Sequence, residues 1–468
     1  MVISMIYKAF KANRNSYLYD RQENRIVKID EADYQCFCEL ERGSITEEGE
    51  KVINKYKTYG LCKENELVEI EHPNTASLEF YLNEGMEQIT LQVTQNCNLR
   101  CDYCAYSGKY VNRTHSKNKM SFETACKVVD FLIKHSRGTK KSIIGFYGGE
   151  PLLEINLIKK IISYIESNYE GKEFTYAMTT NATLLTDEIV DYLVEKNIWL
   201  TISIDGPKSI HDLNRCFENG MGSYDIIIKN LSRMKERYPD YYRNCSTNTV
   251  ISPKQEYDCI QKFFMEDDVM DSLNSKVSFI SDASTNRAIV YEDTVFMEQQ
   301  KDELKQMLFM LGALDNIPRN SLFGDYGHEI HRKYISLHMG GLHAKKGHPS
   351  GPCIAGGKKT FVDIDGNIYP CEKVPECKAM TLGNINTGIS LEKAKDMMNI
   401  ARITEKQCQN CWAFIFCTSC VVASIDEEGV SAEKRLSKCN GVRRNTLEYL
   451  KNIVRLQEYG YRFETAIK

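Results

Sequence analysis

Between residues 88 and 251 the sequence alternates short apolar runs with amphipathic stretches, and this alternation constrains the fold more than any other feature. The apolar runs QITLQVT, SIIGFYG, FTYAMTT, WLTISID and TNTVIS have the length and composition of buried strands. The stretches between them, such as SFETACKVVDFLIKHS and INLIKKIISYIESNY, have the apolar spacing of helices. The sequence therefore predicts an α/β fold with parallel strands covered by helices, either a barrel or a doubly wound sheet.

The unusual residues of the chain fall where these runs end. In both architectures the functional groups lie at the carboxyl ends of the strands. Cys97 follows the first run, and Gly148–Gly149–Glu150–Pro151 closes the second. Asn181 follows the third run, while Ser203 and Asp205 close the fourth. We therefore expect a ligand site along this edge of the sheet.

The composition narrows the class of protein. The chain has 468 residues, of which 42% are hydrophobic and 26% charged, as in a soluble globular protein of roughly two to four domains. A net charge of −4 argues against a general nucleic-acid or membrane-surface binder. Within the first fifteen residues the apolar stretch is too short, and polar residues begin too early, for a signal peptide. We expect a cytoplasmic protein, whose eighteen cysteines stay reduced.

The cysteines gather in two groups whose spacing is typical of metal or iron–sulfur ligation. The first group contains three cysteines after the first strand: Cys97, Cys101 and Cys104. The second lies near the C-terminus: Cys408, Cys411, Cys417 and Cys420. Three thiolates leave one iron of a four-iron cluster open for an outside ligand. Zinc binding is the alternative, because tetrahedral zinc sites use the same spacings.

The segment CNLRCDYC, together with Gly-Gly-Glu-Pro after the next strand, resembles the radical S-adenosylmethionine (SAM) superfamily. The resemblance implies a partial (β/α)6 TIM-like barrel, with a [4Fe-4S] cluster on Cys97, Cys101 and Cys104 and SAM at the open iron. It implies cleavage of SAM to methionine and a 5′-deoxyadenosyl radical that abstracts hydrogen from substrate. It also implies a set of SAM-binding residues: Tyr103 at the adenine; Gly148, Gly149, Glu150 and Pro151 at the methionine amino group; and Asn181, Ser203, Asp205 and Arg215 near the ribose and methionine carboxylate.

The C-terminal cysteines resemble those of the SPASM domain, an extension that holds two auxiliary four-iron clusters. The resemblance implies that the outer cluster is ligated by Cys408, Cys411, Cys417 and Cys439, and the inner one by Cys353, Cys371 and Cys420. The last spacing is CxxC where the usual pattern has three residues between the cysteines. The fourth inner ligand is either Cys377 or a thiol of the substrate. A zinc ribbon is the alternative reading of this region.

Residues 1–75 alternate short strand-like runs with two helical stretches and resemble the RiPP recognition element, a winged-helix-like module that binds the leader of a precursor peptide. The leader is expected to add as a strand to a sheet edge. A winged helix that binds DNA is the alternative, although this region is not markedly basic.

The sequence along nearly the whole chain is similar to that of Cys-rich or CXXX-repeat peptide maturases, which form thioether crosslinks of the sactipeptide or ranthipeptide type. The implied partners are a ribosomal precursor peptide and an electron donor such as flavodoxin or ferredoxin, without nucleic acid or membrane. The runner-up is an anaerobic sulfatase-maturing enzyme, which forms formylglycine, and a different class is an iron–sulfur oxygen sensor. The expected division is a recognition element over 1–75, a radical SAM core over 86–310, a bridging region over 311–349, a SPASM domain over 350–450 and a C-terminal helix over 451–468.

Overall fold

The computed structural model describes residues 6–110, 113–253, 256–283, 285, 289–316, 325–349, 351 and 353–463. Its largest feature is a ten-stranded sheet in the order β12-β11-β10-β9-β8-β5-β14-β15-β16-β17. Neighbouring strands from β12 to β14 are parallel. Six of them form the predicted (β/α)6 partial barrel: β5 (Gln88–Thr94), β8 (Lys141–Gly148), β9 (Glu173–Thr180), β10 (Trp199–Ser203), β11 (Ser246–Ile251) and β12 (Asn274–Phe279).

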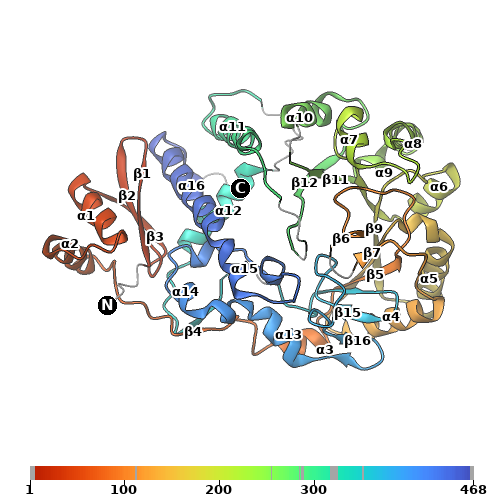
Figure 1. Ribbon diagram of the computed structural model, residues 1–468, viewed down its shortest axis with the longest axis horizontal. Helices are drawn as coiled ribbons and strands as arrows, with labels where there is room; N and C mark the ends of the chain where they lie inside the picture. Colours follow the sequence, from red (N-terminus) through yellow and green to blue (C-terminus); the bar gives the residue numbers. More distant parts are fainter. Residues whose placement is uncertain are drawn as a thin grey trace.

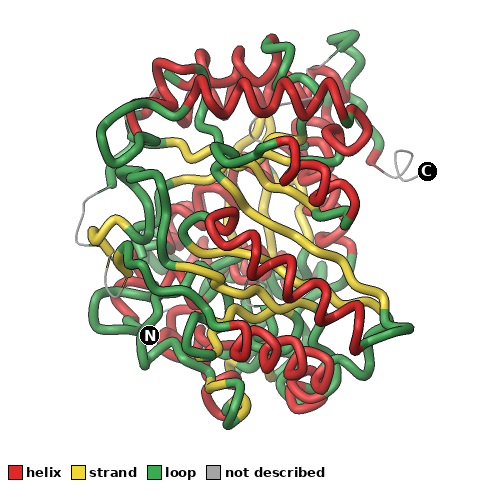
Figure 2. Tube along the Cα trace, turned by 90° about the vertical axis from the view of Figure 1, so that its right-hand side faces the viewer, coloured by secondary structure: helices red, strands yellow, loops and turns green. Residues whose placement is uncertain are grey.

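The helices that connect these strands cover the outside of the sheet (Figures 1 and 2). They are α4 (Phe122–His135), α5 (Ile155–Asn168), α6 (Asp187–Glu195), α7 (Lys208–Asn214), α8 (Tyr224–Arg237), α9 (Pro239–Arg243) and α10 (Tyr257–Glu266). Side-chain caps fix where several begin: the Ser121 hydroxyl accepts from Thr124 N at the start of α4. Their apolar faces and the strands form one buried core, which includes Leu91, Phe146 and Ile202. The strand–helix prediction is confirmed.

The C-terminal part joins the same sheet through four short strands. β14 (Lys359–Val362) pairs in parallel with β5, and β15 (Asn367–Tyr369), β16 (Gly383–Asn384) and β17 (Gly388–Ile389) extend the sheet with antiparallel pairing. Phe361 and Ile368 are buried in the core of the barrel. The sheet therefore extends beyond residue 350, and the expected domain division stays a prediction.

The N-terminal part contains a three-stranded antiparallel sheet followed by two helices. The elements are β1 (Tyr7–Ala12), β2 (Asn15–Asp20), β3 (Arg25–Ile29), α1 (Glu31–Glu41) and α2 (Glu47–Thr58). One face packs on α1 and α2 through a small core that includes Leu18, Phe37 and Val52. The other face shares a second core, including Phe10 and Tyr19, with the C-terminal helices.

Three long helices bridge the two ends of the molecule (Figure 1). They are α11 (Asp293–Met310), α12 (Tyr326–His338) and α16 (Cys439–Glu458). The closing helix thus begins twelve residues before the expected 451 and ends at Glu458, and residues 464–468 of that expectation lie outside the described part. In the described part of the chain, no helix is long and apolar enough to cross a bilayer.

Candidate active site

The three cysteines of the first group lie in the loop after β5, at the carboxyl edge of the sheet. The Cys97 sulfur accepts from Leu99 N at 3.4 Å and from Asn181 Nδ2 at 3.8 Å. Burial raises the pKa of Cys97 and Cys101 to about 12, because an apolar environment disfavours the thiolate. Ligation of a cationic group, which releases the thiol protons, would offset this cost. The thiols thus fit a buried iron–sulfur site.

The Gly-Gly-Glu-Pro segment lies directly against the loop that carries Cys97. Gly148 has φ 134°, and a Cβ there would meet Thr94 O at 2.1 Å. A Cβ on Gly149 would meet Asn96 O at 2.0 Å, so both positions require glycine. The Glu150 amide donates to Asn96 O at 2.9 Å. The end of β8 is therefore fixed against the cysteine loop by backbone contact.

Glu150 is buried, and its carboxylate accepts three hydrogen bonds from the chain. The donors are Leu152 N at 3.0 Å, Thr180 Oγ1 at 2.7 Å and Asn181 N at 2.7 Å. Burial raises its pKa to about 7, although these bonds act in the opposite direction. Pro151 starts a short 3-10 helix, η1 (Pro151–Glu154). Glu150 thus holds the ends of β8 and β9 together, and its contact with a methionine amino group stays a prediction.

Asn181 is held in a ring of polar side chains beside Cys97. Its Nδ2 donates to Asn98 Oδ1 at 2.8 Å, and its Oδ1 accepts from Thr183 Oγ1 at 2.7 Å. Asn98 Nδ2 donates to Thr183 Oγ1 at 2.8 Å, which closes the ring. Ser203, at the end of β10, pairs in register with Asn248 of β11. Both residues lie at the edge that the sequence predicted.

Tyr103, Asp205 and Arg215 form one buried cluster. The Tyr103 hydroxyl donates to Asp205 Oδ2, and the guanidinium of Arg215 lies 5.4 Å from the Tyr103 ring centroid. Arg215 Nε is 3.0 Å from Asp205 Oδ2, and Val250 N donates to Asp205 Oδ1 at 3.0 Å. Burial alone would lower the pKa of Arg215, but the Asp205 carboxylate raises it above its usual value. The three residues predicted around SAM therefore contact one another.

A second buried network was not predicted. Glu376 Oε1 accepts from Arg113 Nε at 2.9 Å and from Gln92 Nε2 at 2.7 Å. Gln92 Nε2 also donates to the Tyr106 hydroxyl at 2.6 Å. The signal in the sequence was Gln92, a polar residue inside the apolar run QITLQVT. This network connects β5 to the loop that carries Cys371 and Cys377.

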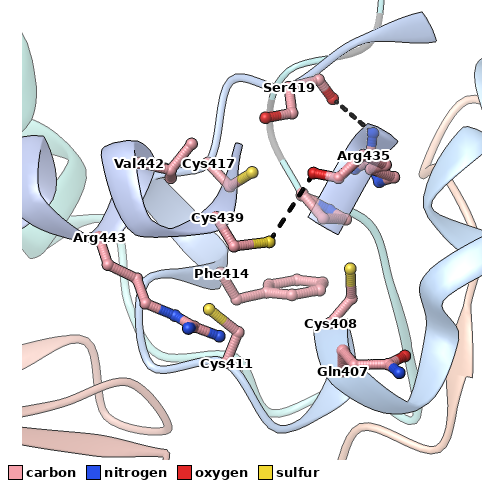
Figure 3. Close-up of a pocket in the computed structure, with 11 residues that line it drawn as sticks. Gln407, Cys408, Cys411, Phe414, Cys417, Ser419, Arg435, Cys439, Val442 and Arg443 are labelled. Atoms are coloured by element: carbon pink, nitrogen blue, oxygen red, sulfur yellow. Dashed lines mark hydrogen bonds between the residues drawn. The ribbon is translucent and has the colours of Figure 1, made fainter. Parts of the chain in front are cut away.

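The outer cysteine group surrounds a hollow at the start of α16 (Figure 3). Tight turns bring the first members together, since Cys411 N donates to Cys408 O at 3.1 Å. Phe414 and Arg443 complete the wall, and the nearby Cys411 thiol raises the pKa of Arg443 against the effect of burial. All four outer ligands implied by the SPASM resemblance line this hollow: Cys408, Cys411, Cys417 and Cys439. The site fits a group larger than one ion.

The inner group brings Cys353 and Cys420 close to Cys371. Burial raises the pKa of the Cys371 thiol to about 11, and Cys353 and Cys420 lie near enough to raise it further. Cys371 and Cys377 both pack against the core of the barrel, and the role of Cys377 as a ligand stays a prediction. Among described residues, no set of three or more His, Cys, Asp or Glu side chains is arranged around a single metal ion.

Residues 91–265 match the sequence profile described as Radical SAM superfamily. Over 244 residues (49% of this chain and 48% of the relative) the sequence is 29% identical to the radical SAM cyclopropyl synthase TigE of Paramaledivibacter caminithermalis. Over 189 residues (40% and 49%) it is 28% identical to a cysteine-type anaerobic sulfatase-maturating enzyme of Clostridium novyi. The chain spans about half the length of the curated relatives it matches first.

Solved structures of native anSMEcpe have the same fold. The structure with bound AdoMet superimposes with a TM-score of 0.60 at 19% identity, covering 80% of this chain and 98% of that one. The structure with bound AdoMet and Cp18Cys peptide gives 0.59 at 18% identity, covering 80% and 99%. The chain therefore carries a radical SAM superfamily domain in an α/β fold shared with these enzymes.

Proposed function

We propose that this chain is a radical SAM enzyme that installs thioether crosslinks, from cysteine sulfur to carbon, in a ribosomally synthesised Cys-rich precursor peptide. One observation carries the proposal: the segment that follows Cys371 is bonded to the segment that follows Cys104, because Arg113 donates to Glu372 O at 3.0 Å and to Glu376 Oε1 at 2.9 Å. A thioether-forming enzyme needs hydrogen abstraction and thiol activation at adjacent places. Two neighbouring cysteine sites are consistent with this division of work.

The proposal assigns the cofactors to the thiols described above. Cys97, Cys101 and Cys104 would hold a [4Fe-4S] cluster, which with SAM bound would supply the 5′-deoxyadenosyl radical. Asn181 donates to the Cys97 sulfur and so tunes its basicity. The cluster of Tyr103, Asp205 and Arg215 fixes the ring of Tyr103 for contact with an adenine. The C-terminal cysteines would hold two auxiliary clusters.

Formation of each crosslink removes two hydrogen atoms from the peptide and makes one sulfur–carbon bond. One hydrogen atom leaves the acceptor carbon and ends on 5′-deoxyadenosine, the cysteine S–H proton goes to solvent, and the sulfur–carbon bond forms. One electron leaves the peptide for an auxiliary iron–sulfur site. An external donor such as flavodoxin or ferredoxin in the cytoplasm would supply the electron that each SAM cleavage consumes.

The N-terminal sheet is proposed as the leader-binding element. β3 lies at the edge of its three-stranded sheet and pairs, among described strands, with β2 alone. Arg25 and Lys28 of β3 are exposed. A leader strand could therefore add to this edge through main-chain hydrogen bonds.

Sulfatase maturation is the second candidate, favoured by the fold shared with anSMEcpe, which has been solved with a Cp18Cys peptide. The two candidates leave different products. A thioether removes two hydrogens from the peptide and keeps its sulfur, whereas formylglycine formation from cysteine removes the sulfur and creates an aldehyde.

The deciding experiment uses the anaerobically reconstituted enzyme with SAM, a reductant and a Cys-rich precursor peptide encoded beside its gene. We expect 5′-deoxyadenosine, a peptide lighter by two hydrogens per crosslink, and loss of alkylatable thiols. An aldehyde that reacts with a hydrazide would favour sulfatase-type maturation. An enzyme that forms no 5′-deoxyadenosine would contradict both candidates.

A further inference from the structure

A pocket lies between the loop of the first cysteine group and the loop that follows Cys371. Its volume is about 140 Å³, which is smaller than a usual small-molecule site and is of the size of a side chain. Tyr103 and Val250 line its barrel side, and Lys373 and Pro375 line the side of the C-terminal part. The pocket therefore adjoins both cysteine sites on which the proposed function depends.

Hydrogen bonds hold one wall of the pocket in place. The Tyr110 hydroxyl donates to Ser281 O at 3.2 Å, and Thr285 Oγ1 donates to Lys109 O at 2.9 Å. These bonds join the hairpin of β6 (Ser107–Tyr110) and β7 (Arg113–Thr114) to the segment after β12. Phe279, the last residue of β12, adds an apolar surface. The pocket is thus bounded by elements that are bonded to one another.

Arg113 lines this pocket with hydrogen-bonding capacity left over. Its side chain is 5% exposed and stacks on the Tyr106 ring at 5.4 Å. Nε donates to Glu376 at 2.9 Å, and Nη1 donates to Glu372 O at 3.0 Å. Its buried Nη2 has no hydrogen-bond partner within the described chain. Buried donors are normally paired, so an acceptor from a ligand is expected here.

The charge of the pocket points to the nature of that acceptor. Lys373 lines the opposite wall and forms no ion pair with a described residue, and the described lining contains no Asp or Glu. Asp282, in the segment after β12, instead pairs with Lys434 and Lys438. Arg113 is paired with Glu376, so the positive charge of the lining that has no ion-pair partner among described residues is that of Lys373. A carboxylate matches both cations, and a guanidinium binds it with directed hydrogen bonds.

We infer that this pocket binds a carboxylate side chain of the peptide, so that an Asp or Glu close to the reacting cysteine is part of the substrate. The inference rests on the proposed function and specifies its substrate class. Arg113 and Lys373 are the specificity-determining residues. The methionine carboxylate of SAM has the same chemistry, and the experiment below separates the two sources.

The test uses pairs of short peptides that differ only in this carboxylate. The probes are acetyl-Cys-Ala-Asp-Ala-amide and its Asn counterpart, with a second pair that has one more alanine between the two residues. Binding to the full-length reconstituted enzyme is measured by calorimetry at low salt, with SAM present. We expect the Asp peptide of at least one pair to bind about tenfold more tightly, corresponding to about 1.4 kcal/mol.

Two variants and a control locate the effect. Lys373→Ala should abolish the preference for Asp while leaving the affinity for SAM unchanged, and Arg113→Lys, which keeps the charge opposite Glu376, should reduce it. Lys378→Ala removes an exposed lysine of the same loop that does not line the pocket and should keep the full preference.

Each contrary result has a distinct meaning. Equal binding of Asp and Asn peptides by an enzyme that cleaves SAM would overturn this inference and leave the proposed function standing. A tenfold loss of SAM affinity in Lys373→Ala, with the Asp preference intact, would assign the pocket to the methionine carboxylate and also overturn it. Absence of any SAM cleavage by the wild-type enzyme would contradict the proposed function itself.

Discussion

Replacement of Asp205 by Asn tests the buried cluster at the predicted SAM site. Asp205 is fully buried, and Arg215 has a side chain only 7% exposed. The asparagine keeps one oxygen for Val250 N, but its amide group faces the guanidinium of Arg215 in place of a charge. Removal of one partner of a buried ion pair costs about 3–5 kcal/mol, because the remaining charge stays desolvated. The single substitution should therefore loosen the ends of β10 and β11.

Native-state hydrogen exchange measures this effect locally, which matters because unfolding of a large chain need not be two-state. Protection of the amides of Ser246–Ile251 should fall by about two to four orders of magnitude if opening of this region becomes easier by that free energy. Protection of the N-terminal strands, which pack in separate cores, should not change.

The double variant Asp205→Asn/Arg215→Met is the matched control. It removes both charges, so its cost should be only that of the lost hydrogen bonds, about 1–3 kcal/mol. The double variant should therefore be more protected than Asp205→Asn alone. Protection losses that simply add, or wild-type protection in the single variant, would refute the ion-pair argument.

The remaining predictions concern the clusters and the N-terminal part. The iron and sulfide content after anaerobic reconstitution should approach twelve of each per chain if three four-iron clusters form. A value near four would contradict the presence of the auxiliary clusters. Triple replacement of the first cysteine group by Ala should abolish 5′-deoxyadenosine formation, whereas replacement of the outer group should retain some of it and lose the crosslinked peptide. Deletion of residues 1–75 should weaken peptide binding strongly. Because it also exposes the core shared with α16, SAM cleavage should be measured beside it as the control for folding. Cys377→Ala should keep the iron count and thioether formation if a substrate thiol completes the inner site, while loss of one cluster would make Cys377 a ligand.

Local patterns were sufficient to predict the barrel and the strand ends at which the candidate site residues lie. The apolar runs that form β5 and β8 have clear ends in the sequence. Cys97 and Gly148 could be chosen as candidate site residues because they stand at those ends. Gly149 shows why the motif is constrained, since its missing Cβ lets Asn96 O approach. These features depend on residues close together in sequence, so each strand and the residues at its end can be predicted without knowledge of the other strands.

The closing helix illustrates how local propensity misleads at a boundary. The expected start at 451 lies well inside the helix, whose first turn contains the weak helix formers Asn440 and Gly441. In the structure the helix begins at Cys439, and the side chain of Val442 helps to line the hollow of the outer group. Packing around that site outweighs the propensity of the first turn.

Contacts between distant segments were beyond the reach of sequence patterns, and they determine how the two cysteine sites are related. Glu376 is separated from Arg113 by 263 residues and from Gln92 by 284, yet it bonds to both. The pairing of β14 with β5 adds continuous main-chain bonding between the same two regions. The spacing of the two sites is therefore set by a sheet and a buried ion pair, not by a flexible linker. Under the proposed function, a substrate cysteine and its acceptor carbon would then fit one nearly fixed distance, and the enzyme would select peptides by the spacing of these residues.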